Sequence, residues 1–333
     1  TINEQWEVLA GLRYARVGYG LENGAPGSND RNDTVLNLQN DTTSTSPKFT
    51  LTWRPETESD VMLYLTWSNG FRPGIINPGL VARIAELEPL IADDPIAKGH
   101  YDFLESRKLA DGDESNNIEL GIKATIADGR VSFTGSLYSI DWEDMIISYD
   151  YDTTDVQGIN PFSVDIIENA GGAESQGLEF EIRAQIADNW ALNIGGDINW
   201  TAKVTDATGL EGTQASGRYG GVGIAEGNRL ANAPKNSAYA SLTYDFSARS
   251  FDAQARLDAY HVAESWNTAN NERPAPSYKT IDGRVTFYKE NWKIGTYIRN
   301  IADEIIVYEF NQVGFRYGRP RTVGFEVTYT PGS

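Results

Sequence analysis

Acidic side chains predominate among the residues that could do chemistry in this sequence, which holds 47 Asp and Glu against 28 Lys and Arg. Many of them fall in residues 70–115, the longest polar stretch of the chain. Together with a histidine and an arginine, they could bind a small polar molecule or form a lid over one. The candidate binding residues are Arg72, Glu86, Asp93, Asp94 and His100. The alternative is a solvated loop, because charged side chains are ordinarily exposed to water.

A second acidic group, formed by Asp150, Asp152 and Asp155, could bind calcium, because calcium prefers clustered carboxylate oxygens. The group lacks the glycine and the remaining ligand positions of a calcium-binding loop. A solvated acidic loop is therefore the alternative, and no other metal site is predicted.

The two histidines, His100 and His261, do not complete a catalytic arrangement. Although His261 and Ser265 lie close together in the sequence, no acidic partner can be named for a triad. His100 could ligate haem from a loop, but a lone histidine gives this idea little support. Cysteine is absent, which excludes disulfides, thiolate metal sites and a cysteine nucleophile. The sequence therefore predicts a protein that is not an enzyme and has no cofactor.

The net charge of −19 argues against nucleic-acid binding, which needs basic patches. No apolar run reaches the length of about 18 residues that a membrane-spanning helix needs. No signal peptide opens the chain and Thr1 is not a start methionine, so we expect a mature, trimmed or partial chain. The mean hydropathy of −0.43 is typical of soluble proteins, but also of barrels in which only alternate residues face lipid.

Strands are the predicted scaffold, because apolar residues recur at every second position. In the first segment Trp6, Val8 and Ala10 fall on one face, whereas Glu7 and Gly11 fall on the other. About twelve segments share this pattern. They cover residues 5–20, 47–54, 61–69, 116–126, 131–143, 173–186, 190–202, 236–246, 251–262, 277–287, 292–302 and 318–329.

The connections between these segments alternate between short and long. The short ones cover residues 55–60, 127–130, 187–189, 247–250 and 288–291. The long ones cover residues 21–46, 70–115, 144–172, 203–235, 263–276 and 303–317. Outer-membrane barrels have tight periplasmic turns and long extracellular loops, whereas a soluble sandwich has no reason to place every long loop at one end. The sequence therefore predicts an all-β, antiparallel transmembrane β-barrel.

The two faces of the predicted strands differ as a membrane wall requires. In segment 173–186, Leu178, Phe180 and Ile182 share one face, and charged side chains occupy the other. A charge that faces hydrocarbon costs about 2–4 kcal/mol, so we expect the charged face to line a polar interior. The predicted lumen-facing residues are Glu119, Lys123, Glu179, Glu181 and Arg183.

The tryptophan positions also favour a membrane-spanning barrel, because all of them fall near predicted strand ends. Amphipathic rings prefer the level of the lipid headgroups, although aromatic residues are also simply common in strands. The predicted girdle consists of Trp6, Trp53, Trp67, Trp142, Trp190, Trp200, Trp266 and Trp292.

Five short runs carry a resemblance to a known family. They are LYLTWSNGFRPG at 63–74, NAGGAESQGLEFE at 169–181, NAPK at 232–235, RNIAD at 299–303 and GRPRTV at 318–323. Each motif alone is weak, but they occur in the family's order over nearly the whole chain. The chain thus resembles the C-terminal portion of a TonB-dependent outer-membrane receptor.

This resemblance implies a 22-stranded barrel around an N-terminal plug domain. Residues 1–333 would form one barrel domain, and nothing in them resembles the plug or the early strands. The implied function is active uptake of a scarce nutrient, with a ferric siderophore as the first expectation. The implied partners are outer-membrane lipid and lipopolysaccharide, the small-molecule nutrient, and the TonB protein through a plug.

Several alternatives remain at this point. The substrate could be a carbohydrate, cobalamin or an aromatic compound instead of a siderophore. The chain could also form a closed twelve-stranded passive pore, since single-chain bacterial barrels have even strand numbers. Direct pairing of the first and last strands would identify such a pore. A soluble all-β binding protein is the third class.

Overall fold

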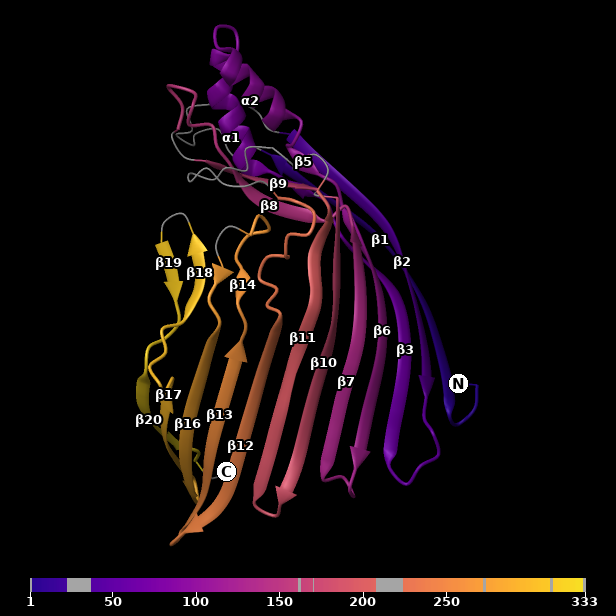
Figure 1. Ribbon diagram of the computed structural model, residues 1–333, viewed down its shortest axis with the longest axis vertical. Coiled ribbons are helices and arrows are strands. Elements are labelled where there is room, and N and C mark those ends of the chain that lie inside the picture. Colours follow the sequence, from indigo (N-terminus) through magenta and orange to yellow (C-terminus); the bar gives the residue numbers. More distant parts are fainter. Residues whose placement is uncertain are drawn as a thin grey trace.

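The computed structural model describes residues 2–22, 37–160, 163–169, 171–207, 224–271, 274–311 and 314–331. Twelve antiparallel strands form one sheet in which the spatial order follows the sequence (Figure 1). They are β1 (Trp6–Glu22), β2 (Asn37–Trp53), β3 (Asp60–Arg72), β6 (Asp113–Ile126), β7 (Val131–Glu143), β10 (Gly172–Ala187), β11 (Trp190–Asp206), β12 (Asn236–Ala248), β13 (Phe251–Val262), β16 (Tyr278–Lys289), β17 (Trp292–Arg299) and β20 (Thr322–Tyr329). The prediction of twelve wall strands is confirmed.

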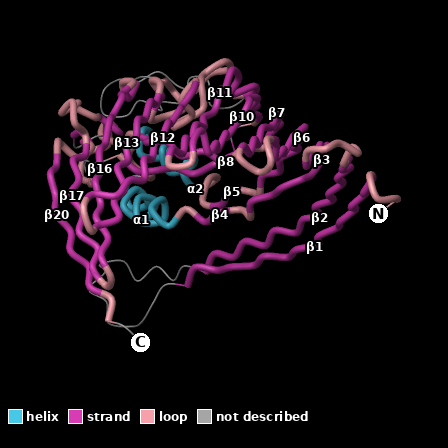
Figure 2. The backbone as a smooth tube through the Cα atoms, turned by 90° about the horizontal axis from the view of Figure 1, so that it is seen from below, coloured by secondary structure: helices cyan, strands magenta, loops and turns pink. Residues whose placement is uncertain are grey.

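The sheet is a curved wall whose two ends differ in the length of their connections. Tight turns join the strands at one end, and the long connections gather at the other (Figure 1). Seen from below, the wall bends round a concave side on which α1 lies (Figure 2). Strands β1 and β20 are the two edges of the sheet, and the described residues show no pairing between them. The wall is therefore an open part of a barrel, which counts against the closed twelve-stranded pore.

Some strand boundaries differ from the prediction. Strand β2 begins at Asn37 rather than at residue 47, and its first residues pair with the far end of β1. This stretch is polar on both faces, so it lacks the alternation on which the prediction depended. Strand β17 ends at Arg299, because Asn300 adopts a positive φ of 50° that stops the strand.

The long connections contain regular structure of their own. Helices α1 (Pro78–Leu87) and α2 (Pro95–Glu105) and the short helix η1 (Glu88–Leu90) follow β3. The paired short strands are β4 (Ile75–Ile76) with β5 (Leu109–Ala110), β8 (Ile146–Tyr151) with β9 (Val164–Asn169), β14 (Ser265–Trp266) with β15 (Pro274–Ala275), and β18 (Val307–Asn311) with β19 (Gly314–Tyr317). Among the described residues, no helix has the length and apolar character needed to cross a bilayer.

The strand register separates charged and apolar residues onto opposite faces of the wall. Lys123 of β6 and Glu181 of β10 both lie opposite Thr134 of β7, so these three side chains share a face. All five predicted lumen-facing residues lie on this charged face: Glu119, Lys123, Glu179, Glu181 and Arg183. The other face carries a directly opposed apolar row formed by Leu120, Leu137 and Leu178.

Tyrosine rings cover glycines on the charged face. The ring of Tyr64 on β3 occupies the space where a Cβ of Gly121 on β6 would stand. The Tyr64 hydroxyl donates a hydrogen bond to the Glu119 carboxylate on the same neighbouring strand. The same contact recurs in the pairs Tyr138–Gly177, Tyr239–Gly195 and Tyr297–Gly324. These glycines let large rings lie flat on the wall, which tightens packing between adjacent strands.

Besides Trp142 of β7, six of the tryptophans predicted for the girdle belong to wall strands near their ends. Those beside the short connections are Trp6, Trp53, Trp190 and Trp292, and those toward the long connections are Trp67 and Trp200. The rings of Trp6 and Trp53 stack with centroids 5.7 Å apart, which ties β1 to β2.

The structure places the other two predicted girdle residues differently. Trp142 packs against a buried core at the end of the wall with the long connections, and the Arg72 guanidinium lies 4.5 Å from its ring centroid. Trp266 belongs to β14, outside the twelve-stranded sheet. Their nearness to strand ends suggested a girdle, but tertiary contacts draw these rings into the long connections instead.

Candidate functional site

The largest buried core of the described chain lies in the long connections and not in the wall. We define the cap as residues 73–112, 144–160 and 163–169, whose helices α1 and α2 pack against the β8–β9 hairpin. Leu80, Leu87, Leu104 and Ile166 are fully buried in this core. Val204 near the end of β11 joins them, as do three residues of two other connections, namely Ala207, Ile224 and Ala269. Loops that are far apart in the sequence thus form one structured unit over the wall.

Arg72, a predicted binding residue, fastens the cap to the wall. Its Nε donates to the Asp113 carboxylate at 3.0 Å, and its Nη2 donates to Asp113 and, at 3.1 Å, to the Ile146 carbonyl. Asp113 is 1% exposed and also accepts from the Ile146 backbone N–H at 2.9 Å. The ion pair therefore joins the ends of β3 and β6 to the first residue of the β8–β9 hairpin.

Asn77, which the sequence analysis did not single out, joins three backbone segments of the cap. Its Nδ2 donates to the Arg107 carbonyl at 2.7 Å and to the Ile167 carbonyl at 2.6 Å. Its Oδ1 accepts from the Ile167 N–H at 3.0 Å. The side chain is 2% exposed, so its loss would leave buried backbone groups without partners. Its position directly before Pro78 is the only signal in the sequence, and it indicates a helix start rather than this contact.

His100 lies buried between α2 and the β8–β9 hairpin. Its Nδ1 is 2.8 Å from the Tyr151 hydroxyl, and its Nε2 is 2.8 Å from the Asp155 carboxylate. Burial raises the pKa of the Tyr151 hydroxyl to about 12, with the Asp155 charge as a smaller cause. Tyr151 therefore keeps its proton, and the Asp155 carboxylate accepts the Nε2–H of the ring. Both ring nitrogens are thus engaged within the protein.

The remaining candidates of the first acidic stretch lie on the cap in different places. Glu86 pairs with Arg83 at 3.2 Å and accepts from the Asn160 backbone N–H at 3.2 Å. Asp94 caps the start of α2 by accepting from the N–H groups of residues 96 and 97. Asp93 is exposed on the surface. The structure does not gather these carboxylates into one binding cluster.

The three aspartates considered for calcium are also separated by their contacts. Asp155 faces His100, and Asp152 accepts from the Thr154 N–H at 2.8 Å within its own turn. The side chain of Asp150 lies outside the described residues. In the part of the chain that the structure describes, no group of three or more His, Asp or Glu side chains could hold a metal ion.

A polar cavity of about 490 Å³ lies beside the β18–β19 hairpin, and sequence reasoning missed it. Its lining residues are Asn232, Asn267, Tyr308, Glu309 and Arg316. They come from three long connections that fold together only in the tertiary structure. Tyr308 packs edge-on against Tyr278 of the charged face, with ring centroids 5.8 Å apart. This contact places the cavity on the side of the wall that carries the charged face.

The charged pair of this cavity is loosely held. Arg316 Nη1 lies 3.7 Å from Glu309 Oε2, and these side chains are 73% and 42% exposed. An exposed pair at this distance contributes little to stability, so either partner can turn toward a ligand. Nearby, the Asn267 amide donates to the Tyr308 carbonyl at 3.1 Å and holds the hairpin against its neighbour. The cavity therefore offers one cation, one anion, two amides and a phenol to a polar molecule.

Asn300 fixes the base of the β18–β19 hairpin. It is 4% exposed, and its Nδ2 donates to the carbonyls of Glu304 at 2.9 Å and Arg319 at 3.2 Å. Its Oδ1 accepts from the Glu304 N–H at 2.9 Å. The two ends of the connection are thereby held together. This contact gives a physical reason for the Asn in the run at 299–303.

Comparisons with known proteins agree with a wall that forms part of a β-barrel. The family model described as TonB dependent receptor-like, beta-barrel, matches residues 1–301. The metal-pseudopaline receptor CntO of Pseudomonas aeruginosa (strain UCBPP-PA14) is 23% identical over 332 residues, which are 98% of this chain and 39% of that receptor.

Solved structures give the same fold. The ferric yersiniabactin uptake receptor FyuA of Yersinia pestis matches with a TM-score of 0.70 at 16% identity, over 98% of this chain and 43% of that one. The siderophore receptor PiuA of Acinetobacter baumannii matches with a TM-score of 0.71 at 17% identity, over 98% of this chain and 41% of that one. The chain thus spans less than half the length of these relatives.

Proposed function

This chain belongs to the TonB-dependent receptor-like β-barrel family of the bacterial outer membrane, and from that premise we propose that the receptor containing it takes up a metal chelate. The matched relatives include a metal-pseudopaline receptor and siderophore receptors, which support this class of substrate. A ferric siderophore is the first substrate to test. Uptake would be active, through a plug domain that contacts TonB.

The observation that carries this proposal is the arrangement at the extracellular end. The cap forms a fixed core, and the polar cavity lies beside the β18–β19 hairpin, which stands at the same end of the wall (Figure 1). Binding sites of this kind combine a rigid scaffold with a few convergent polar groups. We propose that the cavity binds the chelate, with Arg316 for a carboxylate and Glu309 for a cationic group.

The predicted binding residues of the cap enter this proposal in a supporting role. Arg72, Glu86, Asp94 and His100 hold the cap in shape, and exposed Asp93 lies on its surface. On the wall, we propose that the apolar face contacts lipid. The charged face would then contact the plug domain. The girdle tryptophans would mark the two headgroup levels, where lipopolysaccharide is the partner on the outer side.

Uptake by a strain that expresses the full-length receptor tests this proposal. Radiolabelled iron would be supplied as a ferric catecholate, a ferric hydroxamate or ferric citrate, and a metal–pseudopaline complex would form a fourth arm. We expect at least one chelate to accumulate in a TonB-dependent manner and not in the deletion strain. Accumulation of cobalamin or a maltooligosaccharide, with no uptake of any chelate, would show that the substrate is not a metal chelate.

Arg316→Ala and Glu309→Ala separately test the cavity. Each substitution should weaken binding of the transported chelate by about tenfold, since loss of one charged contact at a binding centre typically costs more than 1 kcal/mol. Isothermal titration of the purified full-length receptor measures the affinity. Lys98→Ala is the matched control, because Lys98 pairs with Asp102 on the surface of α2 and is 56% exposed. Unchanged affinity in both cavity variants would place the site elsewhere.

A further inference from the structure

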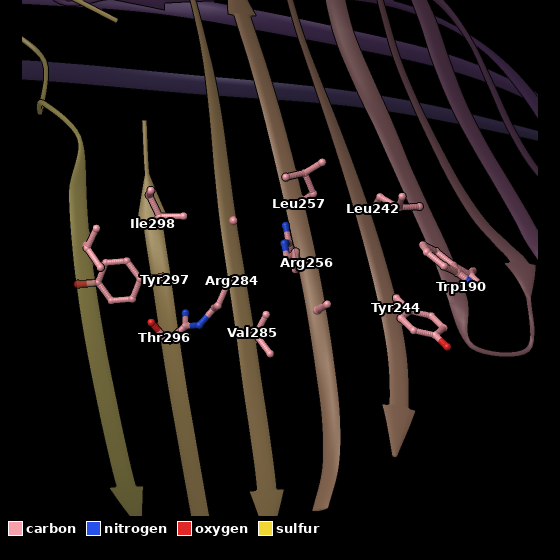
Figure 3. A pocket seen from close by; sticks show the side chains of 13 residues that line it. Trp190, Leu242, Tyr244, Arg256, Leu257, Arg284, Val285, Thr296, Tyr297 and Ile298 are labelled. Carbon is pink, nitrogen blue, oxygen red and sulfur yellow. The ribbon is translucent and has the colours of Figure 1, made fainter. Parts of the chain in front are cut away.

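A groove of about 570 Å³ lies on the apolar face, across strands β12, β13, β16 and β17 (Figure 3). Two rows of side chains on this face border it, and its lining is completed by Arg256, Arg284 and Tyr297, which the register assigns to the charged face. The upper row runs from Leu242 through Leu257, Gly283 and Ile298 to Val323, which lie directly opposite one another on successive strands. The lower row includes Tyr244, Ala255, Val285 and Thr296, and Trp190 stands beside Tyr244. These rows belong to the face opposite the charged one.

Small residues make the hollow. Gly283 and Ala255 form its floor, whereas Leu257, Val285 and Ile298 rise around them. A Cβ at Gly283 would meet only side-chain atoms at 3.6 Å, which is ordinary contact. The wall itself therefore does not require glycine at this position, in contrast to the glycines beneath the tyrosines.

The groove occupies the periplasmic half of the wall. Trp190 stands beside the tight turn after β10 and stacks on Tyr244 with centroids 4.3 Å apart. From the start of β13 to Leu257, the strand is about 20 Å long. Since barrel strands are tilted by about 40° to the membrane normal, this length spans about 15 Å of the membrane thickness. That height is about half of a hydrocarbon layer of about 30 Å. A chain seated in the groove would enter from the periplasmic leaflet.

A positive charge lies at the rim of this face. Lys289 ends β16, follows Val285 and Phe287 on the apolar side, and is exposed. Its Nζ lies 5.2 Å from the Phe251 ring centroid, at the end of the wall with the tight turns. A lysine at headgroup level attracts an anionic group, while the groove above it accepts an apolar chain.

We propose that this groove is a binding site for a phospholipid of the periplasmic leaflet. One acyl chain lies over Gly283 and Ala255, and the phosphate pairs with the Lys289 ammonium. Lipopolysaccharide occupies the opposite leaflet, so it is not the expected occupant. The site is independent of which nutrient the receptor transports.

Native mass spectrometry of the full-length receptor in mild detergent tests the proposal. Phosphatidylethanolamine, phosphatidylglycerol and rough lipopolysaccharide would be added in separate arms. We expect a retained phospholipid, at least tenfold less adduct in Gly283→Leu, and several-fold less in Lys289→Gln. Ala184→Leu is the matched control, because it enlarges a residue on the same face of β10 away from the groove.

Three results would overturn the site. The first is an equal amount of phospholipid adduct in Gly283→Leu and in the parent receptor, and the second is no phospholipid adduct in the parent. The third is that Gly283→Leu removes a lipopolysaccharide adduct but no phospholipid adduct. Heat-dependent mobility on gels checks that each variant is folded. Lys289→Gln changes only an exposed rim residue, so it decides the outcome if the leucine variant does not assemble.

Discussion

The Gly177→Val substitution is expected to leave little folded barrel in the outer membrane. A Cβ at this position would stand 2.7 Å from the Ile198 carbonyl oxygen and 2.6 Å from the Tyr138 ring. A carbonyl in the middle of a paired strand cannot move aside as a side chain can. We therefore expect a loss of about 3 kcal/mol or more in unfolding free energy, at the upper end for overpacking. Urea unfolding in detergent and heat-dependent gel mobility measure this loss.

Gly121→Val provides a matched comparison, because the nearest atoms to its Cβ all belong to the Tyr64 side chain. A second substitution, Tyr64→Ala, should therefore restore assembly of Gly121→Val. The corresponding Tyr138→Ala should not restore Gly177→Val, since the Ile198 carbonyl remains in place. Equal rescue at both positions would contradict the proposed difference between a side-chain and a backbone collision.

The second large effect is expected at the anchor of the cap. Asp113→Ala removes the acceptor of both Arg72 and the Ile146 N–H, which leaves a charge and a backbone donor without their partner. Asp113 is buried but the Arg72 side chain is 47% exposed, so water can solvate the freed guanidinium and the cost is smaller than for a fully buried pair. Loss of the buried acceptor should cost about 2 kcal/mol, or about thirtyfold in a local opening equilibrium. Hydrogen exchange of the full-length receptor should therefore show about thirtyfold faster exchange in β8, while the middle of β6 and β7 is unchanged.

Asp41→Ala is the control for this experiment. Asp41 pairs with Arg16 at 3.3 Å on β1 and β2, but both side chains are more than half exposed. Loss of an exposed pair has little effect on stability. If Asp113→Ala leaves exchange in β8 as slow as Asp41→Ala does, the Arg72–Asp113 pair does not anchor the cap.

The wall could be predicted from sequence because its physics is local. Successive residues of a strand face opposite sides, so Leu178 faces one side and Glu179 the other. The alternation of apolar and polar residues in the sequence shows this arrangement directly. The alternation of short and long connections then indicated an outer-membrane barrel. The first part of β2 was missed, because its residues are mostly polar and show no alternating apolar face. Backbone pairing with β1 and side-chain bonds such as the one from Asn40 to the Ala110 carbonyl hold it in place.

The cap could not be predicted to the same extent, because its core joins connections that are distant in the sequence. Nothing near Val204 indicates that it packs with Leu80, and nothing near His100 indicates Tyr151. The acidic residues were selected by type, whereas the structure uses several of them within the protein. Asp94 is an instructive case, since an Asp followed by Pro is a helix start signal that could have been read as a cap.

The cavity beside the β18–β19 hairpin was missed for the same reason. Asn232, Asn267 and Arg316 lie in separate connections, and none belongs to an acidic cluster or a metal-ligand pattern. Only the fold brings them together. Sequence reasoning therefore predicted the scaffold and the long connections, but not the residues that line the cavity.

The two-faced wall is tested most directly by spin labels on β10. The absence of cysteine from these 333 residues allows single cysteines at 178 to 183 without a competing thiol in this part of the receptor. In reconstituted full-length receptor, labels at 178, 180 and 182 should be relaxed by oxygen, which concentrates in lipid. Labels at 179, 181 and 183 should be shielded from it. Loss of this alternation, or its reversal, would contradict a wall with lipid on its apolar face and a polar interior on the other.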